Sequence, residues 1–217
     1  MSLDILSNCS HDSGQHHPLV IAYYTVGTPY EAEAETLKLS LESLGYSYLV
    51  CGVPHQGSWQ KNTQLKAEFI ALMLEEMPDE PLLYLDVDAV MVQPPVLLDD
   101  LKVDIGAVHF CGGKELLSGT LFLGGTPKCR ELVENWRSIN HQYPETLPNG
   151  KQAWDQRTLA MAIRGTSGVV FEELPQEYTW ITELTQRRIP RLAPVILHTR
   201  GAKRFKRKVN GQKGYAR

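Results

Sequence analysis

Two carboxylates stand inside an apolar run at residues 81–92, "PLLYLDVDAVMV". Asp86 and Asp88 are separated by a single valine, and apolar side chains lie on both sides of them. A buried carboxylate costs free energy unless a partner neutralises it. A metal ion, a basic side chain and solvent could each do so, and each would imply a different kind of protein.

The apolar run predicts a β-strand, and alternation along a strand would point Asp86 and Asp88 to the same face. The pair falls near the end of that strand, just before Pro94 and Pro95. Ligands of open α/β sheets bind outside the carboxyl ends of the strands. Paired carboxylate oxygens there suit Mn²⁺ or Mg²⁺. We therefore expect a divalent cation at this position, where it would also hold a diphosphate.

The segments before the carboxylate pair alternate between strand and helix patterns. Residues 18–27, "PLVIAYYTVG", are nearly all apolar, which is typical of a strand buried on both faces of a parallel sheet. Helical periodicity follows at residues 31–44 and 58–77, with a strand pattern between them at 46–53. This order indicates an α/β protein with a Rossmann-like, mostly parallel central sheet that carries helices on both faces.

The second half of the chain is smaller and more mixed. Its patterns predict strands at residues 104–110, 119–125, 168–174 and 193–201, and helices at residues 127–142 and 153–163. No internal repeat or low-complexity linker divides the chain, so one domain is the simplest account. We expect a flexible arm over residues 1–17, the domain over residues 18–206 and a basic tail over residues 207–217.

The composition is that of an ordinary globular protein, with 42% apolar and 22% charged residues in 217. No apolar run approaches the ~20 residues that span a bilayer. The N-terminus lacks the basic start and apolar stretch of a secretory signal. The four cysteines form neither a Cys-x-x-Cys pair nor a zinc-binding pattern with histidine, which favours reduced thiols. We expect a cytoplasmic protein without a transmembrane segment.

Charge is unevenly distributed along the chain. Residues 200–217 carry eight basic side chains and no acidic one, although the whole chain has a net charge of −3. A basic tail on an acidic body suggests that the tail meets an anionic partner. The phosphates of a ligand, an anionic membrane surface and the protein's own acidic face are candidates, and a solvated tail is the alternative.

Three further motifs follow the Asp-x-Asp pair. They are "LLSGTLFLGG" at residues 116–125, "WDQRTLAMAI" at 154–163 and "HTRGAKR" at 198–204. In this order, and with the Tyr-Leu-Asp-x-Asp strand before them, they resemble the nucleotide-sugar glycosyltransferases of the GT-A fold, and the last motif resembles the retaining family-8 group. The likeness extends over residues 18–206. It implies a hexosyltransferase that uses Mn²⁺ or Mg²⁺, a nucleoside-diphosphate donor (UDP above all), and a retaining mechanism. The acceptor, whether glycan, protein or small molecule, stays open.

The resemblance also implies roles for individual residues. The proposed metal ligands are Asp86, Asp88 and His198. The side chains that would contact the donor sugar as catalytic residues are Asp155 and Gln156. The remaining donor-binding positions are Thr25 and Val26 at the base, Lys66, Val87, Ser118 and Gly119 near the sugar, and Gly201, Lys203 and Arg204 at the diphosphate. The sequence departs from the family at one point, because the family's lysine three residues after the glycine is Arg204 here and no Pro-Trp follows.

Other readings of the same residues remain open. A phosphatase of the haloacid-dehalogenase type also carries Asp-x-Asp on a strand, with Asp86 as nucleophile. It would need a later acidic pair, for which "FEEL" at residues 171–174 is the candidate. Nucleotidyl transfer would usually bring a glycine-rich basic loop after the first strand, where this chain is acidic. A non-catalytic module that binds a nucleotide sugar would retain the same carboxylates.

Overall fold

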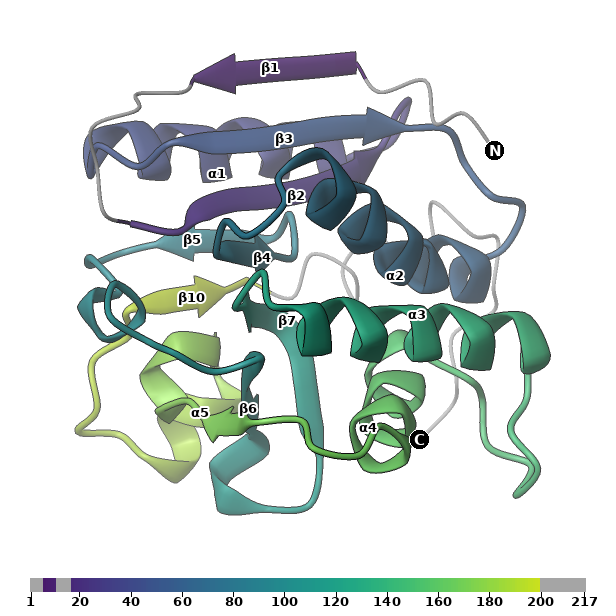
Figure 1. Ribbon diagram of the computed structural model, residues 1–217. Coiled ribbons are helices and arrows are strands. Elements are labelled where there is room, and N and C mark those ends of the chain that lie inside the picture. The colour runs from purple at the N-terminus through teal and green to yellow at the C-terminus, as the bar shows by residue number, and fades with distance from the viewer. Residues whose placement is uncertain (1–5, 11–16, 200–217) are drawn as a thin grey trace.

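The computed structural model describes residues 17–199 and the backbone of residues 6–10. These residues form an α/β fold in which helices cover both faces of a seven-stranded central sheet (Figure 1). This arrangement confirms the predicted α/β fold class. Within the described residues, no helix is long and apolar enough to cross a membrane.

The central sheet has the strand order β1-β3-β2-β4-β7-β6-β8. Strands β3, β2, β4, β6 and β8 run in one direction, and β1 and β7 run against them, so the sheet is mostly parallel. The strands span β1 Leu6–Ser10, β2 Leu19–Thr25, β3 Tyr48–Val53, β4 Leu82–Leu85, β6 Ile105–His109, β7 Leu116–Leu123 and β8 Phe171–Glu173.

A second, three-stranded sheet has the order β5-β10-β9. Its strands are β5 Ala89–Met91, β9 Trp180–Ile181 and β10 Ile196–His198. Strand β10 pairs antiparallel with β5 and parallel with β9. This small sheet brings the end of the described chain back beside the segment that follows Asp88.

The helices that pack on the central sheet lie on opposite faces of it. Helix α1 lies behind the sheet in the view of Figure 1, and α2 and α3 lie in front. The helices span α1 Tyr30–Ser43, α2 Trp59–Glu76, α3 Pro127–Gln142, α4 Asp155–Gly165 and α5 Leu184–Arg188. Short 3₁₀ turns at Val96–Leu98, Phe110–Gly112 and Gln176–Thr179 complete the described elements.

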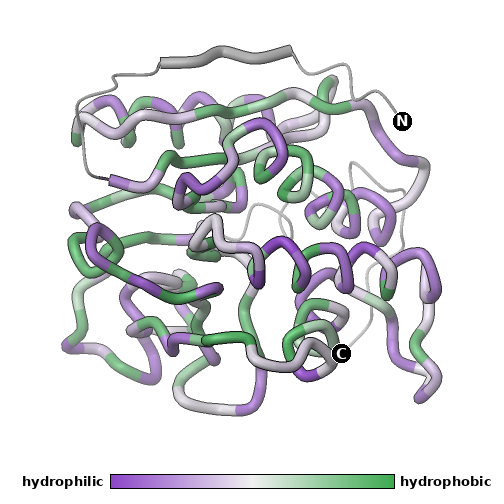
Figure 2. The backbone as a smooth tube through the Cα atoms, in the orientation of Figure 1, coloured by the Kyte–Doolittle hydropathy of each residue, from purple (hydrophilic) through white to green (hydrophobic). Residues whose placement is uncertain are grey.

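Alternation along β2 explains why the sheet has a core on each face. Ile21 and Tyr23 pack in the cluster under α2, α3 and α4, whereas Val20 and Ala22 pack in the cluster under α1. All four side chains are buried, which explains why the sequence of β2 is a nearly continuous apolar run. Figure 2 shows the helices alternating between hydrophilic and hydrophobic residues, as expected when only one side of each helix faces a core.

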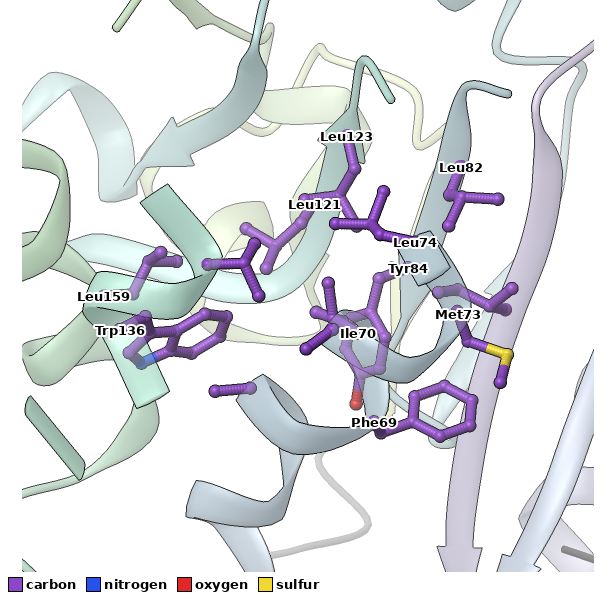
Figure 3. Close-up of a cluster of buried hydrophobic side chains, with 14 of the residues drawn as sticks. Phe69, Ile70, Met73, Leu74, Leu82, Tyr84, Leu121, Leu123, Trp136 and Leu159 are labelled. Atoms are coloured by element: carbon purple, nitrogen blue, oxygen red, sulfur yellow. The ribbon is translucent and has the colours of Figure 1, made fainter. Parts of the chain in front are cut away.

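The larger core joins α2, α3 and α4 to the central strands (Figure 3). Trp136 of α3 is fully buried in it, and its indole Nε1 donates a hydrogen bond to Thr158 Oγ1 of α4 at 2.9 Å. This hydrogen bond satisfies a buried polar group and fixes α4 against α3. Helix α4 carries Asp155 at its first position, so this packing also positions part of the candidate site.

The expected single strand over residues 81–92 is wrong. Strand β4 ends at Leu85, the chain turns at Asp86, and β5 begins at Ala89 in the other sheet. The turn is closed by a hydrogen bond from Ala89 N to Asp86 O, 2.9 Å long. Because both short strands are buried, their apolar residues read as one strand. The argument that alternation places the two carboxylates on one face therefore does not hold.

Three other segments differ from the sequence-based expectation. Strand β1, Leu6–Ser10, lies within the expected flexible arm and pairs with β3. Pairing of this kind satisfies the free backbone groups of a sheet edge and needs no hydrophobic pattern. The expected last strand, residues 193–201, is limited to Ile196–His198. Helix α5 and strand β9 were not expected at all, and the proposed tail over residues 207–217 lies outside the described residues.

We predict that Trp136→Ala lowers the free energy of unfolding by about 3–5 kcal/mol, because it leaves a cavity between α3 and α4. Urea unfolding followed by circular dichroism measures the change. The matched control is Leu39→Ala on α1, whose side chain is 65% exposed, and which should shift stability by less than about 0.5 kcal/mol. Equal losses in the two variants would contradict this account of the core.

Candidate active site

A pocket of about 550 Å³ opens at the carboxyl ends of β2 and β4. Its walls come from β2, α1, α2, the turn after β4, β7, α4 and the segment from β9 to β10. This is the edge at which open α/β sheets bind their ligands. The pocket is large enough for a small-molecule ligand.

The pocket brings together most of the site residues proposed from the sequence. The proposed residues that line it are Thr25, Lys66, Asp86, Val87, Asp88, Ser118, Gly119, Asp155, Gln156 and His198. Val26 follows the pocket-lining Thr25 but is not among the lining residues, and its side chain lies against Gly52 of β3. Gly201, Lys203 and Arg204 lie outside the described residues.

Lys66 is the centre of a hydrogen-bonded network in the floor of the pocket. Its ammonium Nζ lies 2.8 Å from Asp86 Oδ1 and 2.5 Å from Asp155 Oδ2, and it donates to the carbonyl oxygen of Ser118 at 2.9 Å. The Ser118 hydroxyl in turn donates to Asp155 Oδ2 at 2.7 Å. Lys66 is only 2% exposed. One buried cation therefore joins α2, the end of β4, β7 and the start of α4.

The network shifts the protonation equilibria of its members. Burial alone would lower the pKa of Lys66, but the negative charges of Asp155 and Asp86 outweigh it and raise that pKa, so the ammonium stays charged. Desolvation raises the pKa of Asp86, and the nearby Lys66 partly counters this rise. Tyr84 donates its hydroxyl to Asp86 Oδ1 at 3.0 Å, and burial raises the pKa of this phenol well above its usual value.

His198 lies on the other side of the carboxylate pair. The Thr120 hydroxyl donates to the carbonyl oxygen of Tyr178 at 2.8 Å and also lies 2.9 Å from His198 Nε2. A hydroxyl has one proton, so the Thr120 oxygen must accept the second hydrogen bond, and Nε2 carries the imidazole proton. Nδ1 lies on the opposite side of the ring, 3.5 Å from Asp88 Oδ1. A histidine whose other nitrogen donates a hydrogen bond is arranged as metal-binding histidines are.

Gly119 allows the groups on the two sides to approach one another. A Cβ at this position would lie 3.2 Å from His198 Nδ1 and 3.3 Å from Asp86 Oδ2. Asp86 N also donates to the carbonyl oxygen of Gly119 at 2.8 Å, which fixes the turn against β7. Any side chain at residue 119 would crowd the carboxylate and the imidazole.

The donor set fits a divalent cation. Two carboxylates and one imidazole are oxygen and nitrogen ligands of the kind that Mn²⁺ takes. Asp86 Oδ1 is held by Lys66 and Tyr84, which leaves Oδ2 toward Gly119 and His198. Within residues 17–199, no three acidic, histidine or cysteine side chains already stand in a coordination arrangement. Binding a cation would therefore require these side chains to move.

Comparison with known proteins identifies the fold. No protein-family model and no curated protein matches the chain. Among solved structures, a glycosyltransferase involved in glycosylation of the major capsid of PBCV-1 has a TM-score of 0.66 at 15% identity, over 88% of this chain and 96% of that one. The chain has a glycosyltransferase fold.

Two other solved structures share this fold. The apo form of the glycosyltransferase GlyE of Streptococcus pneumoniae TIGR4 has a TM-score of 0.60 at 15% identity, over 84% of this chain. This chain spans about half of GlyE, with 54% of that protein covered. Mouse xyloside xylosyltransferase 1 has a TM-score of 0.51 at 12% identity, over 85% of this chain and 98% of that one.

The sequence analysis missed several residues of this pocket. Tyr23, Tyr24 and Tyr30 line it, together with Glu115, the residue before β7. The two tyrosines of β2 read as part of an apolar strand, which concealed them. Burial, followed by the charges of Asp88 and Asp86, raises the pKa of Tyr30. The pocket wall also contains Trp59 and Trp154, whose rings meet edge to face at 5.4 Å.

The acidic pair that a haloacid-dehalogenase reading requires lies elsewhere. Glu172 and Glu173 are exposed on β8, and Glu173 pairs with His109. Neither glutamate lines the pocket that contains Asp86. The structure thus separates "FEEL" from the Asp-x-Asp pair.

We predict that Lys66→Met lowers the free energy of unfolding at pH 7.5 by about 3 kcal/mol, because it leaves the buried Asp155 carboxylate without its cation. The loss should be smaller at pH 5. Asp86 has a raised folded-state pKa, and removing Lys66 raises it further. A raised carboxyl pKa stabilises the folded state at low pH, and this contribution is lost as pH rises through the folded pKa.

Urea unfolding at the two pH values measures both effects. The control is Lys61→Met on the same helix, because Lys61 is exposed, and it should change stability by less than about 0.5 kcal/mol at either pH. A Lys66→Met variant as stable as the control would show that the ammonium does not compensate the carboxylates.

Proposed function

We propose that the protein is a metal-dependent glycosyltransferase that moves a sugar from a nucleoside-diphosphate donor, with UDP as the nucleotide, to an acceptor. One observation carries the proposal. Asp86, Asp88 and His198 meet at one pocket with Lys66 and Asp155, in a chain that has a glycosyltransferase fold. This combination supplies ligands for a cation and polar groups for a sugar in a single site.

Asp86, Asp88 and His198 would hold Mn²⁺ or Mg²⁺. When bound, such a cation would neutralise the diphosphate and stabilise the nucleoside diphosphate as it leaves. The hydrogen bond between Nε2 and Thr120 would orient the His198 ring so that Nδ1 faces the carboxylates. Lys203 or Arg204 would add positive charge at the diphosphate, as the motif resemblance implies.

The other pocket residues would position the donor. Thr25 and Tyr30 line the pocket at the end of β2 and the start of α1, where the base would bind. Asp155 and Gln156 begin α4 and would accept hydrogen bonds from sugar hydroxyls. Asp155 is held by Lys66 and Ser118, which favours this binding role over that of a free general base. A retaining mechanism rests on the likeness of "HTRG" to the retaining group.

We predict that UDP binds in the presence of Mn²⁺ and binds much more weakly without it, and that GDP and ADP bind more weakly than UDP. Asp88→Asn should lower UDP affinity in Mn²⁺ by about tenfold or more, because it removes a charged ligand. Isothermal titration calorimetry measures each affinity. The control is Asp100→Asn, which changes an exposed aspartate outside the pocket, and should bind UDP as the wild type does.

Turnover separates this proposal from its rivals. Mn²⁺-dependent hydrolysis of UDP-glucose, UDP-galactose or UDP-N-acetylglucosamine would support a transferase site. Metal-dependent binding of UDP without any hydrolysis would favour a non-catalytic binding module. Failure to bind any nucleotide would contradict both, and phosphatase activity that is lost in Asp86→Asn would favour the haloacid-dehalogenase reading.

A further inference from the structure

Glu115 and Gln156 form a polar pair across the pocket wall. Gln156 Nε2 donates a hydrogen bond to Glu115 Oε1 at 3.0 Å. Both residues line the pocket, Glu115 from the position before β7 and Gln156 from the first turn of α4. Glu115 lies just outside the motif at residues 116–125.

The chemistry of the two groups fixes the orientation of the amide. An ionised carboxylate only accepts hydrogen bonds, whereas a glutamine amide has a donor end and an acceptor end. The NH₂ end of Gln156 must therefore face Glu115, because the opposite orientation would bring two acceptors together. The carbonyl Oε1 then points away from Glu115, and the described residues provide no hydrogen-bond donor to it.

We propose that Glu115 is a positioning residue that holds the Gln156 amide with its carbonyl oxygen available to the donor sugar. This inference rests on the proposed function. Gln156 directly follows Asp155, so the pocket would present a carboxylate and a carbonyl side by side at the start of α4. The matching ligand is a neutral sugar whose hydroxyl groups donate to both. With the amide reversed, its NH₂ group would compete with those hydroxyls for acceptors.

Glu115 is suited to this role because no positively charged side chain of the described residues competes with Gln156 for its carboxylate. The other pocket carboxylates are Asp86 and Asp155, which contact Lys66, and Asp88, which faces His198. Glu115 forms no ion pair with any described residue. Its exposed side chain accepts a hydrogen bond from the Gln156 amide, next to the N-terminus of α4, where the helix dipole favours a negative charge.

The test uses the full-length protein in a double-mutant cycle. The reaction is Mn²⁺-dependent hydrolysis of whichever of UDP-glucose, UDP-galactose and UDP-N-acetylglucosamine the wild type hydrolyses fastest. Glu115→Ala and Gln156→Ala should each lower kcat by about tenfold, the scale of one lost hydrogen bond involving a charged group. KM and the UDP affinity should not change. The double variant should be no slower than Gln156→Ala, because Glu115 acts through Gln156.

Three kinetic results would overturn the proposal. They are a Glu115→Ala variant with wild-type kcat, losses that multiply in the double variant, and a loss of UDP affinity in place of kcat. Glu172→Ala is the matched control, since it removes an exposed glutamate outside the pocket, and it should hydrolyse the donor at the wild-type rate.

A second measurement separates failure of this inference from failure of the proposed function. The side-chain NH₂ resonances of Gln156, assigned by their absence in Gln156→Ala, should shift in Glu115→Ala and stay in place in Glu172→Ala. Unchanged resonances in Glu115→Ala overturn the positioning role whatever the protein's activity. A wild type that binds no nucleotide overturns the proposed function instead, even where the resonances shift as expected.

Discussion

The ammonium group of Lys66 is the interaction on which the site depends. It lies between Asp86 and Asp155 and also donates to the main chain at Ser118. Two carboxylates this close together would repel each other, and a buried cation lowers the free energy of keeping both ionised. The contacts come from α2, the end of β4, β7 and α4. The same ion pairs that compensate charge therefore also fix the relative positions of four elements, so the geometry of the pocket and the packing of the fold are coupled.

The break between β4 and β5 gives the two aspartates different surroundings. Asp86 contacts Lys66 on the side of α2 and α4, whereas Asp88 faces His198 on the side of α1 and the small sheet. A continuous strand would have placed both on one face and in one environment. The turn instead lies between the two hydrophobic cores. Because Gly119 has no side chain, the imidazole of His198 has room beside Asp86. A ligand that spans both sides of this turn would lie beside Lys66 and His198 together.

The sequence predicted the parts of this structure that local patterns control. Strands β2 and β3 and helices α1 and α2 follow from strand and helix periodicity, and ten of the pocket residues followed from the motifs. The parts that it could not predict depend on contacts between distant segments. Strand β5 forms by pairing Met91 with Ile196, and Glu115 meets Gln156 only in the folded chain. An apolar run such as "PLLYLDVDAVMV" reads the same whether its two halves join one sheet or two. A side chain outside any motif, such as Glu115, cannot be assigned to the pocket from the sequence, because only the folded chain brings it there.

The charge balance of the pocket is the strongest physical argument for a cation. Among its described lining residues, Asp86, Asp88, Glu115 and Asp155 are acidic, whereas Lys66 is the one lysine or arginine. Lys66 already contacts two of these carboxylates, so little of its positive charge remains for a ligand. A nucleoside diphosphate is itself an anion and would be repelled by such a pocket in the absence of added positive charge. His198 directs Nε2 to Thr120, which leaves Nδ1 on the side of Asp88 as a candidate ligand atom. Positive charge from outside the described residues would therefore favour the binding of an anionic donor at this site. A divalent ion held by Asp86, Asp88 and His198, as proposed above, would supply such charge.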